Sequence, residues 1–395
     1  MRQWWRRLLP GLLVGLSLSL GTAFGLSACQ ATSELTTAEE VTPIAVQATE
    51  LSDSADESSA NAVATPLPPE TAALIAQLAP AGLADPPRGD IRFVVLSDFN
   101  SAYGSTDYDP EVDQAIALLP FWQPDLVICG GDMVAGQKAS LTPDQINAMW
   151  DAFDQHVAAP LRAQGVPFGF TMGNHDGSGA LSGSGSFIFA QERDLATAYW
   201  NTPAHDPGVD FRDRADFPFY YSFSLDDIFV LVWDGSTNQI PADKLAWVEQ
   251  ELSSPAAQAA QLTILVGHLP LYAVAEGRNA PGEVMANADE LRALLERHQV
   301  HTYISGHHHA YYPGHVGNLQ TLQSGAIGSG PRAYIGQDQP TPKTLTVVDV
   351  HYDQPELTTY TTYNMATLQA IAMSELPRSL TGHNGTVFRR DVSPD

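Results

Sequence analysis

The sequence contains few cysteines, few basic residues and few long apolar runs, and each shortage excludes a class of structure or function. Its 395 residues include two cysteines, Cys29 and Cys129. Because Cys129 is the one cysteine that follows Cys29, the domain cannot build a disulfide framework. Cys129 lies in an apolar run and predicts a buried thiol. No segment after the N-terminus is long and apolar enough to span a bilayer.

Basic residues are scarce: 19 lysines and arginines stand against 45 aspartates and glutamates, a formal net charge of −26. This balance disfavours nucleic-acid binding, which depends on contacts from basic residues to phosphates. An anionic substrate would therefore need local positive charge, which metal ions could supply. Acidity that serves only solubility is the alternative explanation, and the two are compatible.

Residues 1–28 predict a lipoprotein signal peptide. Three arginines precede an apolar run from Leu8 to Leu26, and the segment ends in Leu-Ser-Ala-Cys. This ending resembles the lipobox of bacterial lipoproteins, which implies cleavage before Cys29 and its acylation. The acyl chains would anchor the protein to the lipid bilayer of the cell envelope, facing the periplasm or the exterior. An uncleaved membrane helix and an ordinary signal peptide are the alternatives.

Composition divides the remaining chain into a linker, one domain and a tail. Residues 29–88 are rich in Ala, Thr, Ser, Glu and Pro, and they hold almost no aromatic residue. We predict a disordered acidic linker there, with room for a short helix near Glu70–Leu78, because such a composition buries too little surface to fold alone. No similar linker interrupts residues 89–365, which predicts a single domain. The order of residues 366–395 and the oligomeric state stay open.

Short apolar runs alternate with helical patterns in this domain, which predicts an α/β architecture. Five runs each end in polar or glycine-rich sequence: Arg92–Ser97, Leu126–Cys129, Phe168–Met172, Leu262–Val266 and His301–Ser305. The helical patterns cover Glu111–Leu119, Pro143–Val157, Ala242–Leu252 and Ala288–His298. Further runs have fewer helices between them: Phe219–Leu225, Ile228–Trp233, Leu319–Gln323, Thr344–Val350 and Leu357–Thr362. These later runs favour added antiparallel strands, and the whole fits a two-sheet sandwich with helices outside.

Each of the five runs that end in polar or glycine-rich sequence is followed by a residue that can bind a metal. The endings are Ser97-Asp98-Phe99-Asn100, Gly130-Gly131-Asp132, Gly173-Asn174-His175-Asp176, Gly267-His268 and Gly306-His307-His308-His309. Ligands gather at the carboxyl ends of strands in α/β sheets. One Gly-Asp pair is usually a turn, and a lone histidine is more often structural than a ligand. Five such endings in order nevertheless predict one metal centre.

The endings resemble the motifs of the calcineurin-like metallophosphoesterase family, which run Asp-x-His, Gly-Asp, Gly-Asn-His-Asp/Glu, Gly-His and Gly-His-x-His. Four of the five match without alteration. The resemblance implies an αββα two-sheet sandwich with two divalent or trivalent metal ions, such as Mn, Fe or Zn. It also implies hydrolysis of small phosphate esters by metal-bound hydroxide. Monoesters are slightly favoured over diesters, a preference that rests on the expected location alone.

The resemblance also implies roles for individual residues. Asp132 would bridge both metals, and Asp98 and His309 would bind the first. The second metal would be held by three residues: Asn174, His268 and His307. In an extended segment His307 and His309 would point to the same side, and His308 would point away to a supporting or surface position.

His175 resembles the family's histidine that binds no metal and that stabilises charge or protonates the leaving oxygen. Asp176 could hydrogen-bond to His175 and orient it. A structural turn residue is the alternative for His175. Beyond the motifs, Arg332 either contacts a phosphate or is an ordinary surface arginine.

The first motif departs from the family pattern because Asn100 stands where a histidine is usual. Its carbonyl oxygen could bind the first metal as a harder and weaker donor, or Asn100 could be a turn residue whose place at the metal is taken by water. Purple acid phosphatases also lack this histidine, but they carry a tyrosine where this chain has Ala135, so we expect no iron-tyrosinate centre. The altered motif supports one alternative function, a non-catalytic lipoprotein that keeps the fold to bind metal or phosphate.

We expect the mature protein to begin at Cys29 and to carry acyl chains there, because the lipobox-like ending is complete and follows an apolar run. Mass spectrometry of the N-terminal peptide, after expression in a bacterial host, measures this directly. An unmodified Cys29 in the mature chain would contradict the prediction.

Overall fold

The computed structural model describes residues 66–354 and 356–394. The predicted signal peptide, Cys29 and most of the predicted linker lie outside the described residues, so those predictions stand untested. Within the part of the chain that is described, no helix combines the length and the apolar character that crossing a bilayer requires.

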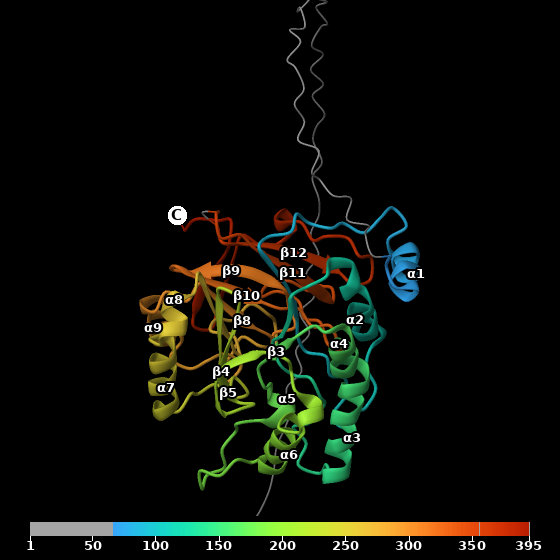
Figure 1. Cartoon of the computed structure of the whole chain (residues 1–395). Coiled ribbons are helices and arrows are strands. Elements are labelled where there is room, and N and C mark those ends of the chain that lie inside the picture. The colour runs from blue at the N-terminus through green and yellow to red at the C-terminus, as the bar shows by residue number, and fades with distance from the viewer. Residues whose placement is uncertain (1–65, 355, 395) are drawn as a thin grey trace, which may run out of the picture. The chain divides into compact units, whose positions relative to one another are not determined.

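Two β-sheets make up the centre of the domain (Figure 1). The first sheet has five strands, in the order β12 (Thr358–Asn364), β11 (Thr344–Val350), β1 (Ile91–Leu96), β2 (Leu126–Cys129) and β3 (Phe168–Phe170). Strands β1, β2 and β3 are parallel, and β11 and β12 extend the sheet with antiparallel pairs.

The second sheet has nine strands. Their order is β13 (Ser379–Gly382), β14 (Gly385–Arg389), β9 (Tyr312–Val316), β10 (Leu319–Gln323), β8 (Thr302–Ser305), β7 (Leu262–Val266), β6 (Ile228–Val232), β5 (Tyr220–Leu225) and β4 (Asp210–Asp216). Strands β6, β7, β8 and β10 are parallel, and the outer strands pair antiparallel.

Helices lie along two opposite sides of the paired sheets (Figure 1). One side carries α2 (Pro110–Trp122), α3 (Pro143–Phe153) and α4 (Ala159–Gln164), and the other carries α7 (Ala242–Leu252), α8 (Pro255–Ala259) and α9 (Ala288–Arg297). Helix α7 contacts β6 and α9 contacts β10. The remaining helices are α1 (Pro69–Leu78), α5 (Asn174–Gly177) and α6 (Ala190–Trp200), with short turns at Asp154–Ala158, Pro203–His205 and Met373–Glu375. The predicted αββα sandwich is confirmed.

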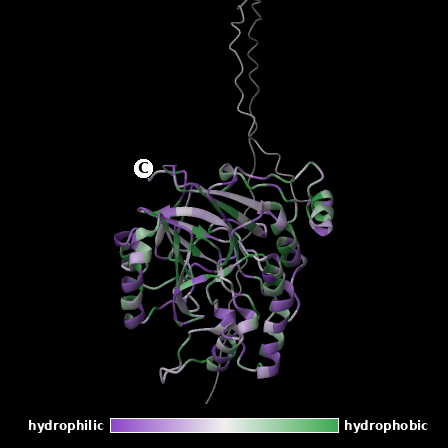
Figure 2. Ribbon diagram, in the orientation of Figure 1, coloured by the Kyte–Doolittle hydropathy of each residue, from purple (hydrophilic) through white to green (hydrophobic). Residues whose placement is uncertain are grey.

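Burial explains why the predicted strands formed. Every residue of β1, β2, β7, β8 and β11 is buried, as expected for strands that are covered on both faces. Figure 2 shows these central strands as mostly hydrophobic, while the helices on the outside carry hydrophilic residues. Helix α3 begins at Pro143, as its sequence predicts, and its first turn is closed by a reciprocal capping box between Thr142 and Gln145.

Elements without a clear apolar pattern were not predicted. Strand β4 is largely exposed and rich in charge, which is typical of a protected sheet edge. The helix expected over 143–157 is interrupted at Asp154–Ala158 by a π-helical turn. Pro160, just beyond, lacks the N–H that a regular helix would need there.

The predicted linker ends earlier than residue 88. Helix α1 occupies the position considered for a short helix, and its Thr71 hydroxyl donates to the carbonyl oxygen of Ala117 at 2.7 Å. Leu74, Ile75 and Leu78 recur at helical spacing and pack on the core. The tail whose order was left open contains β13 and β14, and β14 pairs with β9.

A buried ion pair joins the first strand of the domain to a late one. Arg92 Nε lies 2.8 Å from Asp349 Oδ1, and the two side chains are 2% and 1% exposed. Arg92 also contacts Asp85 at 2.8 Å, so the pair fixes the start of the domain as well.

Replacing Asp349→Ala should lower the free energy of unfolding by about 3 kcal/mol, because it leaves a buried guanidinium without its main partner. Urea unfolding monitored by tryptophan fluorescence measures the change. The matched control is Asp210→Ala, which breaks the exposed pair with Arg212 and should cost less than about 1 kcal/mol. Equal effects of the two substitutions would refute the role given to the buried pair.

Candidate metal centre

Strand ends from both sheets meet at one place and bring candidate ligands together in two groups. The first group is Asp98, Asp132 and His309, and the second group is Asp132, His268 and His307. Within each group the potential ligand atoms all lie within 4.8 Å of one another, and every member is buried. Asp132 belongs to both groups, so its carboxylate is placed to join two cations.

The backbone at these residues is unusual. Asp98, Asp132, His307 and His309 have φ angles of 55°, 56°, 64° and 53°. Residues other than glycine rarely adopt this left-handed conformation, which costs about 1–3 kcal/mol where the surroundings enforce it. The expectation of an extended segment was wrong: His307 and His309 reach the two groups because each sits at a left-handed turn. His308 is fully buried, where Nε2 donates to the carbonyl oxygen of Glu283 at 3.0 Å.

Two glycines allow the loops to approach closely. A Cβ atom on Gly306 would overlap the Ser97 hydroxyl and would lie 2.7 Å from Asp98 Oδ2. A Cβ atom on Gly173 would overlap Asp132 Oδ1. The motif glycines are therefore needed for space around the two carboxylates.

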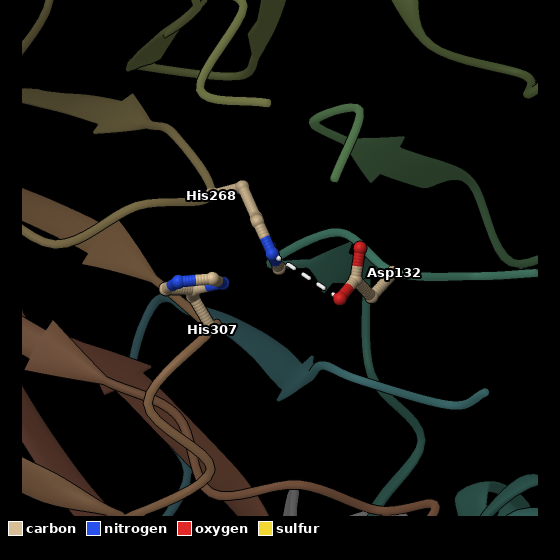
Figure 3. A group of neighbouring side chains, drawn as sticks. All are labelled: Asp132, His268 and His307. Atoms are coloured by element: carbon tan, nitrogen blue, oxygen red, sulfur yellow. Dashed lines mark ion pairs between the residues drawn. The ribbon is translucent and has the colours of Figure 1, made fainter. Parts of the chain in front are cut away.

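His268 lies between Asp132 and Asn174 in the second group. Its Nδ1 donates to the carbonyl oxygen of Gly130 at 2.7 Å, which leaves Nε2 facing Asp132 Oδ2 at 3.3 Å and Asn174 Oδ1 at 3.0 Å. Figure 3 shows this ring nitrogen turned to the Asp132 carboxylate, with His307 alongside. Burial lowers the pKa of His268, but Asp132, Asp98 and the Gly130 carbonyl together raise it more, to about 9. The three polar atoms therefore converge on one point.

His307 presents a free nitrogen to the same group. Its Nε2 lies 2.9 Å from Glu283 Oε2, and that carboxylate acceptor places the proton on Nε2. Its Nδ1 is buried and has no hydrogen-bond partner among the described residues. Burial and the neighbouring His268 and Arg278 hold the pKa of His307 well below its usual range. A neutral imidazole with an unused lone pair is what a metal ligand requires.

The first group is arranged in the same way. His309 Nδ1 donates to the carbonyl oxygen of Gly330 at 2.8 Å, so Nε2 faces Asp98 Oδ1 at 3.2 Å. Burial raises the pKa of Asp98, but His309 and His268 together lower it more. Carboxylate, imidazole and amide donors suit Mn, Fe or Zn, and the orphaned Nδ1 of His307 is explained by a metal. The residues therefore fit two metal ions.

His175 lies beside these groups without joining them. Its backbone N–H donates to Asp132 Oδ1 at 2.8 Å, and its Nδ1 faces the carbonyl oxygen of Gly136 at 3.2 Å. That acceptor directs Nε2 inward, 3.9 Å from Asp132 Oδ2. The Tyr103 ring lies against the imidazole with centroids 4.9 Å apart. His175 is thus positioned to exchange a proton next to the shared carboxylate.

Asp176 has a different role from the one expected. Its carboxylate accepts four backbone N–H bonds of 2.7–2.9 Å instead of orienting the His175 ring; the donors are Asp132, Met133, Val134 and Gly173. Burial and the charge of Asp132 raise the pKa of Asp176 to about 7. Asp176 therefore fixes the loop that carries Asp132 to the loop that carries Asn174.

The sequence profile of the calcineurin-like phosphoesterases matches residues 91–311, more than half of the chain. The chain belongs to this family. No curated protein sequence matches it.

A solved phosphatase structure shares the fold. The purple acid phosphatase PPD1 from yellow lupin (Lupinus luteus) seeds is 15% identical, with a TM-score of 0.50; the match covers 73% of this chain and 54% of that one. GAP50 of Plasmodium, the anchor in the inner membrane complex, is 15% identical over 71% of this chain and 87% of its own, with a TM-score of 0.46. This chain therefore spans about half the length of the lupin phosphatase, and identity this low establishes the fold alone.

Several supporting residues of this phosphoesterase-family chain were missed from the sequence. Gln137 Oε1 accepts from Asn174 Nδ2 at 2.8 Å, which turns Asn174 Oδ1 to His268. Glu192 in turn accepts from the backbone N–H of Gln137 at 2.8 Å. Glu283 contacts His307 from a loop far away in sequence. None lies in a motif, although Gln137 does follow the second motif closely.

Asn100 is buried beside the first group, and its backbone carbonyl accepts from Ser329 at 3.1 Å. Within the described residues its side-chain amide makes no hydrogen bond. Its role as a ligand stays a prediction.

Loss of the shared carboxylate should have a larger effect on metal content than loss of either histidine. We expect about two metals per chain in the wild type, about one in His309→Ala or His307→Ala, and none in Asp132→Ala, because two-metal sites share a bridging ligand. Metal analysis of dialysed protein measures this, with His156→Ala on the surface as the control. Retention of both metals by Asp132→Ala would contradict the assignment.

Proposed function

We propose that the protein hydrolyses phosphate esters of small molecules at a dinuclear metal site. The observation that carries this proposal is the position of Asp132, which is shared by both groups of candidate ligands and lies beside His175. Metals held there would polarise the phosphoryl oxygens, activate water and offset the charge that develops during hydrolysis. Family membership supports this class of reaction.

The residues of the chain would divide the remaining work. His175 would donate a proton from Nε2 to the leaving oxygen, while its Nδ1 stays bonded to Gly136. The Tyr103 ring would keep the imidazole from rotating away. Asp176 would hold the Asp132 loop in place, because the four backbone hydrogen bonds that its carboxylate accepts resist any shift of that loop.

We also propose that the enzyme works outside the cytoplasm, anchored by an acylated Cys29. The lipobox-like ending of the signal segment supports this location. In that setting, release of phosphate from monoesters would be a natural task, which is the basis for favouring monoesters over diesters.

The proposal is tested by adding Mn, Fe, Zn or no metal to the purified protein and measuring turnover of 4-nitrophenyl phosphate and bis(4-nitrophenyl) phosphate. We expect metal-dependent hydrolysis. His175→Ala should lower kcat about 10²–10⁴-fold because a general acid is lost, with metal content unchanged.

Two outcomes would count against this account. Full activity of His175→Ala at normal metal content would remove the proton-donor role. Absence of turnover with every metal, despite measured loading of two ions, would favour the non-catalytic alternative that binds metal or phosphate.

A further inference from the structure

Two arginines lie side by side next to the candidate metal centre. Arg278 Nη1 is 2.5 Å from Glu283 Oε2 and 3.4 Å from His307 Nε2. The backbone N–H of Arg332 donates to the carbonyl oxygen of His309 at 3.3 Å. A Cβ atom on Gly277 would lie 3.0 Å from Arg332 Nη1, so this head group packs against the residue that precedes Arg278.

Each of the two guanidinium groups has an N–H donor without a hydrogen-bond partner among the described residues. In both, this donor is the buried Nε atom. Arg278 has Glu283 as its partner, whereas Arg332 forms no ion pair within the described part of the chain. Burial and the neighbouring Arg278 lower the pKa of Arg332. The cluster of Arg278, Arg332 and Glu283 thus carries a net positive charge in a chain whose formal charge is −26.

The position of the pair separates it from the metal ligands themselves. Arg278 contacts His307 at Nε2, whereas the nitrogen left free for a metal is Nδ1. The guanidinium therefore lies across the imidazole ring from the metal-facing atom. The arginines therefore lie beside the candidate ligands without belonging to either group, where they could contact a part of the substrate other than the phosphoryl group.

We propose that Arg278 and Arg332 bind a second anionic group of the substrate, a carboxylate or a phosphate. Guanidinium groups bind both oxyanions through paired N–H bonds, and both side chains are partly exposed. The inference rests on the proposed phosphoesterase function and narrows its substrates to phosphate esters that carry another oxyanion. Arg332 determines this specificity, while Arg278 is also tied to His307 through Glu283.

Non-hydrolysable phosphonates test the site without turnover. Calorimetric titration of the metal-loaded full-length protein compares ethylphosphonate and propylphosphonate with phosphonoacetate, 3-phosphonopropionate and 1,2-ethylenediphosphonate. The series varies the distance between the two charged ends and distinguishes a carboxylate from a phosphate. At least one doubly anionic probe should bind about tenfold more tightly than its singly functional counterpart.

Arg332→Gln should abolish this preference and leave ethylphosphonate affinity within about twofold, and Arg332→Lys should keep part of it. Arg212→Gln on β4, which loses an exposed arginine paired with Asp210, should behave as the wild type. Metal content and the thermal midpoint of each variant exclude loss of the metals or of the fold.

No preference in the wild type would overturn the inference, and so would equal weakening of all probes by Arg332→Gln, which would place Arg332 on the reacting phosphoryl group. Failure of ethylphosphonate itself to bind would contradict the proposed function as well. The two failures are therefore distinguishable.

Discussion

The structure depends on the need to stabilise the buried carboxylate of Asp132. This side chain is almost fully buried, and burial alone makes a carboxylate costly. It is compensated on both oxygens: Oδ1 accepts from the His175 backbone, and Oδ2 faces His268. Two metals would add far more positive charge at the same point. The neighbouring loops are shaped around this one group.

The loops reach Asp132 by means that cost stability. Four candidate ligands adopt a left-handed backbone conformation. Gly173 and Gly306 lack a Cβ atom where one would overlap neighbouring atoms, and this allows the strand ends to meet. Asp176 offsets part of this cost with four backbone contacts across two loops. The sandwich supplies rigidity, since the parallel strands β1, β2, β3, β7 and β8 end at the centre. The fold therefore preorganises the candidate ligands for cations.

The sequence predicted the strands and the candidate ligands that meet at their ends, because both leave local patterns. A buried parallel strand is an apolar run, and the candidate ligand follows the end of the run, as Asp132 follows the strand that ends at Cys129. The same reasoning missed β4, whose exposed face has no apolar pattern. It also misjudged Asp176, because a carboxylate near a histidine in sequence says nothing about which N–H groups it meets. Glu283 and Gln137 act through contacts that only the fold creates, and the left-handed turns at His307 and His309 leave no signature in residue type.

Crystals soaked in Mn or Zn, with anomalous scattering data collected at the metal edge, test the central claim most directly. We expect two peaks, each within about 2.0–2.2 Å of one oxygen of Asp132. One peak should be completed by Asp98 and His309, and the other by Asn174, His268 and His307 Nδ1. A single peak, or two peaks of which only one touches Asp132, would contradict the account of a shared carboxylate.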